Sequence, residues 1–96
     1  MTIRQAFREV SDALVALEDL RVQREASGRE VVANGERVRI SRARYLAGIT
    51  SYFEVLDAER QFFASEVALS QVTRANLQAV VQLYLALGGG WRASAS

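Results

Sequence analysis

The chain of 96 residues contains no cysteine, no histidine and no proline, and each absence excludes something. Without cysteine there is no disulfide, no thiolate metal site and no cysteine nucleophile. Without histidine the commonest acid–base group is missing. Without proline, long stretches can be helical with no forced break. We therefore expect neither an enzyme nor a protein that holds a metal or cofactor.

Long apolar runs and an excess of one charge are also missing. No stretch approaches the roughly 18 apolar residues of a membrane span, and the charges in the first twenty residues predict that no signal peptide is present. The net charge is +1, and no residue is lysine. Arg37 and Arg44 share one helix face, whereas Arg39 and Arg42 lie nearly opposite. Because no continuous basic stripe forms, we do not expect nucleic-acid binding.

What the chain does have is helical periodicity on both sides of one glycine. Gly48 can adopt the left-handed conformation that ends a helix. Ser51 is a good N-cap, and Glu54 would complete a capping box. The pattern predicts an all-α fold, a single hairpin of two long antiparallel helices in coiled-coil-like packing. The expected parts are a helix over about residues 3–46, a turn at 47–50, a helix over 51–87 that ends at the glycines 88–90, and a loose tail at 88–96.

The first helix should begin with a capping box between Thr2 and Gln5. Its apolar row is strong at both ends and weak in the middle, so we expect a bend, fraying or local unwinding over residues 25–39. Gly28 and Gly35 have two interpretations, either tolerated flexibility or close approach of a neighbouring helix. The row comprises Phe7, Val10, Leu14, Leu17, Arg21, Arg24, Gly28, Val31, Gly35, Val38, Arg42 and Tyr45.

The second helix carries two apolar rows with heptad spacing. A two-helix hairpin needs only one of them, so the other would be an exposed apolar stripe unless a further helix covers it. This predicts assembly, either as a ring of helices or as a four-helix dimer. One row comprises Phe53, Leu56, Arg60, Phe63, Val67, Ser70, Arg74, Leu77, Val81 and Tyr84. The other comprises Val55, Ala58, Phe62, Ser65, Leu69, Val72, Asn76, Ala79, Leu83 and Ala86.

Three segments together resemble one protein family. RYLAGITS at residues 44–51, followed by VLDAER at 55–60, resembles the periplasmic tip of TolC-like outer-membrane efflux channels of the OprM/NodT type. AFREVSDAL at 6–14 resembles the start of the last ascending helix of that family, and LYLALGGGW at 83–91 resembles its C-terminal end. The resemblance spans nearly the whole chain. It implies the C-terminal helical hairpin of a longer protein, which contributes to a trimeric α-helical barrel.

The resemblance also implies partners and sites. The hairpin would lie in the periplasmic portion of an outer-membrane channel that exports drugs or other small molecules. Its tip would contact a periplasmic adaptor, and an inner-membrane pump would act indirectly. The adaptor-contact tip would be Ala47, Gly48, Ile49, Thr50 and Ser51, and the periplasmic gate would be Tyr45, Glu54 and Asp57. Thr50 departs from the TolC pattern, which has an arginine there.

Two alternatives to the channel interpretation remain, one for the acidic residues and one for the function of the chain. Glu54 and Asp57 also suit the first turns of a helix as acids that favour its macrodipole, and too few ligands lie near them for a metal site. The alternative function is a stand-alone helical hairpin that dimerises as a protein-interaction module. Either function would cover the second apolar row of the second helix.

Overall fold

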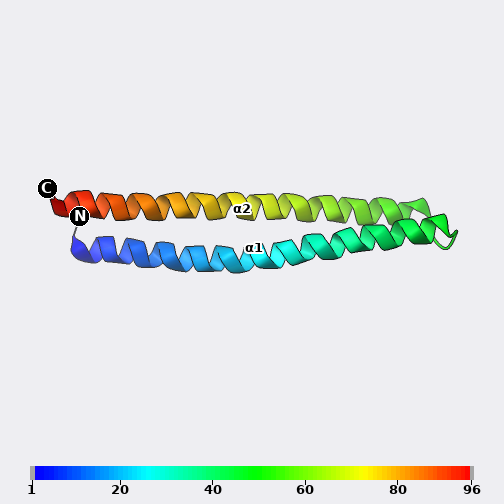
Figure 1. Cartoon of the computed structure of the whole chain (residues 1–96), viewed down its shortest axis with the longest axis horizontal. Coiled ribbons are helices and arrows are strands. Elements are labelled where there is room, and N and C mark those ends of the chain that lie inside the picture. The colour runs from blue at the N-terminus through cyan, green and yellow to red at the C-terminus, as the bar shows by residue number, and fades with distance from the viewer. Residues whose placement is uncertain (1, 96) are drawn as a thin grey trace.

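The computed structural model is an extended hairpin of two helices that pack antiparallel along their length (Figure 1). The structure describes residues 2–95, with side chains up to residue 88. Helix α1 spans Ile3–Leu46 and helix α2 spans Tyr52–Ala95, with 44 residues in each. The molecule measures 73 × 15 × 12 Å. The predicted all-α antiparallel hairpin is therefore confirmed.

The beginning of α1 is the capping box that the sequence predicts. The Thr2 hydroxyl accepts a hydrogen bond from the Gln5 backbone N–H at 3.2 Å, and the Gln5 side-chain oxygen accepts one from the Thr2 N–H at 3.1 Å. Two of the donors that a helix N-terminus leaves without partners are thereby satisfied.

The end of α1 is a Schellman motif at Gly48. Gly48 has a φ of +75°, the left-handed value expected for it. The Ile49 N–H donates to the Arg44 carbonyl at 2.9 Å, and the Gly48 N–H donates to the Tyr45 carbonyl at 3.0 Å. These two bonds satisfy carbonyls that the helix end would leave open and turn the chain back on itself.

The beginning of α2 differs in detail from the expected capping box between Ser51 and Glu54. The Glu54 carboxylate instead accepts a hydrogen bond from the hydroxyl of Thr50, four residues earlier. The Glu54 backbone N–H bonds the Ser51 carbonyl at 3.2 Å. A hydrogen bond to an ionised carboxylate is stronger than one between neutral groups, and the Thr50 hydroxyl can supply it.

The C-terminal part of α2 corrects a second expectation. The helix continues through the glycines 88–90 to Ala95. The predicted helix end at Leu87 is therefore wrong, and so is the loose tail as far as residue 95. Ser96, the last residue of the predicted tail, lies outside the described residues. Each glycine costs about 1 kcal/mol relative to alanine, but none blocks the helix. Once a helix is formed, each further residue adds one hydrogen bond, so a short glycine run can be carried.

The two apolar rows of α2 face in different directions. Val55, Ala58 and Ser65 of one row are buried against α1, with exposed fractions of 1%, 4% and 8%. The other row is exposed: Phe53, Phe63, Leu77, Val81 and Tyr84 leave between 56% and 81% of their surface open. The hairpin thus uses one row for its own seam and leaves the second without cover, as the sequence predicts.

The face of α1 that packs against α2 agrees with the expected row in part. Val10, Leu17, Gly28, Val31, Gly35 and Val38 of that row are partly or fully buried, and so are residues outside it, namely Ala6, Ala13, Leu20, Ser27, Asn34 and Ser41. Phe7 and Leu14, which the expected row contained, are 78% and 53% exposed. Small side chains let two helices approach closely, whereas the expected row followed the larger apolar residues.

The middle of α1 is an unbroken helix, so neither the fraying nor the local unwinding expected over residues 25–39 occurs. Of the third alternative, a bend, Figure 1 shows only a gentle curve. Arg21 bonds Glu18 at 2.6 Å and Glu25 at 2.8 Å. The hydrogen bond and the charge of Arg21 lower the pKa of Glu18. This pairing stabilises the helix at any pH above the pKa that the Glu18 carboxyl has in the unfolded chain. The stabilisation is lost as the pH falls through the lower pKa of the folded state.

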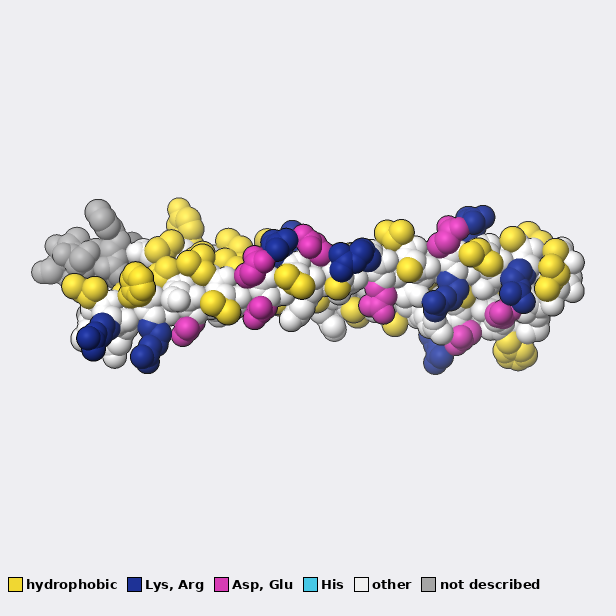
Figure 2. Space-filling model, turned by 90° about the horizontal axis from the view of Figure 1, so that it is seen from below, with side chains coloured by type: hydrophobic (Ala, Val, Ile, Leu, Met, Phe, Trp, Pro, Cys, Tyr) yellow, Lys and Arg dark blue, Asp and Glu magenta, His cyan; other side chains and the backbone are white. Residues whose placement is uncertain are grey.

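The outer surface mixes exposed apolar residues with charges of both signs. On the face in Figure 2, hydrophobic side chains recur along the length, and acidic and basic side chains alternate between them without a patch of one sign. In the part of the chain that the structure describes, neither helix has a stretch long and apolar enough to cross a membrane.

Candidate functional site

The tip of the hairpin is an open surface. Ala47, Gly48, Ile49 and Ser51 are exposed, and Thr50 is half-buried. Ile49 leaves 67% of its surface open. Apart from Gly48 and its two chain neighbours, no residue has an atom within 4 Å of the place where a Cβ on Gly48 would be. The residues predicted to contact an adaptor are therefore together and accessible, with an apolar side chain beside exposed backbone.

Two tyrosines join the helix ends just behind the tip. The ring of Tyr45, in the last turn of α1, lies 5.1 Å from that of Tyr52, the first residue of α2, with an interplanar angle of 59°. Such tilted aromatic pairs stabilise by about 0.5–1.5 kcal/mol beyond the area they bury. Tyr45 was predicted from the sequence as a site residue, and Tyr52 was not. The available signal was that the two lie almost equally far from the turn.

The two predicted gate acids are exposed on the first turns of α2, and each has its own local partners. Glu54 accepts the Thr50 hydroxyl. Asp57 accepts hydrogen bonds from Arg60 and from the Gln61 amide, both at 3.0 Å. Tyr45 contacts Tyr52 rather than either acid. No three potential metal ligands gather anywhere among the described residues.

Two polar contacts cross between the helices below the acids. Arg42 of α1 pairs with Glu59 of α2 at 2.6 Å, and Arg37 of α1 donates to the side-chain oxygen of Gln61 at 2.9 Å. Neither contact was predicted from the sequence, where the arginines were weighed only as a basic stripe and found to form none. These contacts show that the arginines of this segment face several different partners.

A tight contact lies beside these links. A Cβ on Gly35 would lie 3.2 Å from the ring of Phe62, whereas a Cβ on Gly28 would have nothing within 4 Å. Close helix approach is therefore the correct interpretation for Gly35. A shallow groove runs over this contact, and it is lined by Gly35, Val38, Arg39, Arg42, Glu59 and Phe62.

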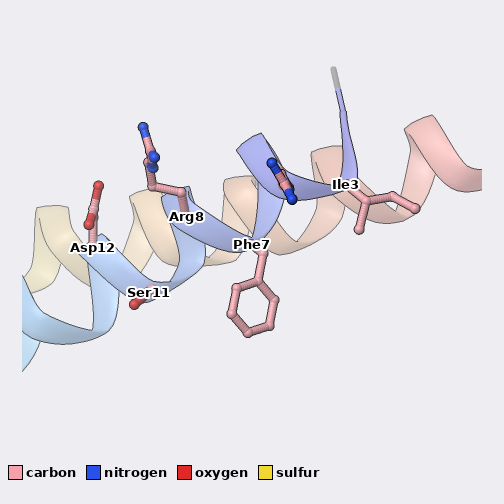
Figure 3. Close-up of a pocket in the computed structure, with 6 residues that line it drawn as sticks. Ile3, Phe7, Arg8, Ser11 and Asp12 are labelled. Carbon is pink, nitrogen blue, oxygen red and sulfur yellow. The ribbon is translucent and has the colours of Figure 1, made fainter.

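A second hollow lies at the opposite end of the molecule and is a weak candidate. All its lining residues come from one stretch of α1, between Ile3 and Asp12. Figure 3 shows the side chains of Phe7 and Arg8 pointing in different directions from the helix rather than toward a common point. No arrangement for catalysis or specific binding results there.

Comparisons with known proteins agree with the resemblance at the tip. The family model described as outer membrane efflux protein matches residues 1–89. The chain is 39% identical over 90 residues to the outer membrane protein OprJ of Pseudomonas aeruginosa, which covers 94% of this chain and 19% of OprJ. It is 42% identical to a probable efflux pump outer membrane protein, TtgC, of Pseudomonas putida, over 94% of this chain and 19% of TtgC.

A third relative is the cation efflux system protein CusC of Escherichia coli, 40% identical over 94% of this chain and 20% of CusC. The chain thus spans about a fifth of the length of the relatives it matches. The match covers both helices and the turn between them. The chain belongs to the outer membrane efflux protein family.

Proposed function

We propose that this chain is the C-terminal helical hairpin of an outer-membrane efflux channel and forms part of its periplasmic tunnel. In this proposal three copies of the full-length protein assemble, a periplasmic adaptor contacts the tip, and an inner-membrane pump supplies the energy. The relatives include a cation efflux system protein and an efflux pump protein, which differ in what they are named for. We therefore propose only a class of exported substrate, drugs or other small molecules.

The observation that carries this proposal is the exposed apolar row of α2. A free hairpin would leave Phe53, Phe63, Leu77 and Tyr84 in water, each more than half exposed. Contiguous exposed apolar surface of this kind marks an interaction site in soluble proteins. A tunnel wall gives α2 one helix neighbour at each of its two rows. A dimer of hairpins would cover the row as well, but family membership favours the tunnel.

The tip and the gate have separate roles in the proposal. Gly48 and Ile49 present open backbone and an apolar side chain to the adaptor. Glu54 and Asp57 point acidic groups into the narrow end of the tunnel, where three-fold symmetry would bring like charges together. Such charges repel each other and attract cations unless they are paired, so the partners of Asp57 and Glu54 would set how tightly this end closes. Tyr45, held by Tyr52, is the third gate residue.

The tip assignment predicts that Gly48→Asp in the full-length channel abolishes export while the channel still folds. A residue other than glycine at this φ is strained by about 1–2 kcal/mol, but asparagine and aspartate tolerate it best. Gly48→Asn is the matched control, because it carries the same strain without the charge. The measurement is the susceptibility of cells that depend on this channel, together with the amount of channel in the outer membrane. Normal export by Gly48→Asp would contradict the tip assignment.

A further inference from the structure

Among the residues whose side chains the structure describes, Gln61 is the one that joins α1 to a proposed gate acid by hydrogen bonds. Its amide nitrogen donates to Oδ2 of Asp57 at 3.0 Å, and its amide oxygen accepts from the Arg37 guanidinium at 2.9 Å. Arg60 donates to the other oxygen of Asp57, Oδ1, at 3.0 Å. Both oxygens of the Asp57 carboxylate therefore accept a hydrogen bond. The donor to Oδ1 is Arg60 of the same helix, and the donor to Oδ2 is Gln61, which is itself bonded to Arg37 of the opposite helix.

The chemistry of this chain of contacts requires a group at position 61 that both accepts and donates hydrogen bonds. Arginine can only donate hydrogen bonds, and a carboxylate can only accept them. The residue between Arg37 and Asp57 must therefore accept on one side and donate on the other. Glutamate would place a second negative charge against Asp57, and lysine would place a second positive charge against Arg37. Glutamine satisfies both neighbours, and its orientation follows from their chemistry.

The two partners of Asp57 differ in how firmly they are held. The Arg60 side chain is 80% exposed and belongs to the same helix as Asp57. Gln61 is half-buried and tied across the seam to α1. A long exposed side chain gains little from an ion pair, because it must give up its freedom. Gln61 is thus the better anchor of the carboxylate.

We propose that Gln61, backed by Arg37, is a positioning residue that holds the Asp57 carboxylate in place and couples it to the packing of α1 against α2. This inference rests on the proposed function, in which Asp57 acts at the gate. Any shift of α1 along α2 near the tip would then move or release the carboxylate. This relay of Arg37, Gln61 and Asp57 makes the position of the negative charge at the narrow end of the tunnel depend on how α1 packs against α2.

The test measures cation over anion permeability of the full-length channel in planar lipid bilayers. We expect Gln61→Met to lower the permeability ratio by about twofold, the scale of one side-chain hydrogen bond. Gln82→Met is the matched control, because Gln82 is exposed and occupies the same heptad position three heptads later on α2. Its ratio should stay at the wild-type value.

A second background separates positioning from general structural damage. With Asp57→Asn in place, Gln61→Met should change nothing further, because no carboxylate remains to be positioned. The exchange of Arg37→Gln with Gln61→Arg should restore the ratio, since the introduced arginine can donate to both neighbours. An equal effect of Gln61→Met in both backgrounds would overturn the relay. If Asp57→Asn alters the permeability ratio but Gln61→Met does not, the role of Gln61 is contradicted and the role of Asp57 at the gate is supported. If Asp57→Asn leaves the ratio unchanged, both roles are contradicted.

Discussion

Replacing Gly35 by leucine should loosen the hairpin, whereas the same change at Gly28 should stabilise it. A Cβ at Gly35 would already lie 3.2 Å from Cε2 of Phe62, and the rest of a leucine has to displace that ring or push the helices apart. Forcing extra carbons into a packed site typically costs about 1–3 kcal/mol. This exceeds the gain of about 1 kcal/mol from removing a glycine from a helix.

The Gly28 variant keeps the gain without the crowding, because nothing lies within 4 Å of its Cβ. Thermal unfolding is followed by helical circular dichroism at one protein concentration. The midpoint temperature should fall for Gly35→Leu and rise for Gly28→Leu. For a chain of this size, 1 kcal/mol corresponds to about 4–8 °C in the midpoint. Equal stabilisation by both leucines would show that α1 and α2 are not in close contact at Gly35.

Charges placed in the exposed row of α2 should prevent assembly but leave each hairpin folded. Phe63 and Leu77 are 68% and 61% exposed in the single chain, so Phe63→Glu with Leu77→Glu costs the hairpin little. In a tunnel wall both positions would be covered. Each apolar side chain buried there contributes about 1.5–3 kcal/mol, and an unpaired buried carboxylate costs more. We expect the full-length double variant to lose its trimer.

The matched control places two glutamates on the same helix outside the row. Gln71 and Gln78 are exposed and belong to neither apolar row, so Gln71→Glu with Gln78→Glu adds the same charge without removing an apolar side chain of the row. The measurement is the oligomeric state of the purified channel in detergent, with helical content as the check on folding. A trimer that survives Phe63→Glu with Leu77→Glu would mean that this row is not an interface.

The hairpin could be predicted from the sequence because its signals are local. Gly48 and Ile49 end α1 through backbone bonds to residues three and five positions earlier, respectively. The spacing of apolar residues alone separates the two rows of α2. The capping box of Thr2 and Gln5 is likewise read within four residues. Each of these features depends on the nature and spacing of neighbouring residues, which the sequence contains directly.

The cross-helix contacts could not be predicted, because they depend on the distance between the helices and their relative rotation. On α1 the seam includes Asn34 and Ser41 beside the expected Gly35, whereas the expected Arg42 is exposed. The contacts of Gln61 with Arg37 and of Tyr45 with Tyr52 follow from that rotation. The end of α2 was mispredicted because helix propagation outweighs a short run of glycines.

The central claim is that the exposed row of α2 is an interface, and sedimentation velocity of the 96-residue chain tests it most directly. With Phe53, Phe63, Leu77 and Tyr84 exposed, the chain should associate as its concentration rises, and its sedimentation coefficient should increase with concentration. Phe63→Glu with Leu77→Glu should abolish that increase while the helical signal persists. A helical chain that stays monomeric at every concentration, with no difference between wild type and variant, would contradict the claim.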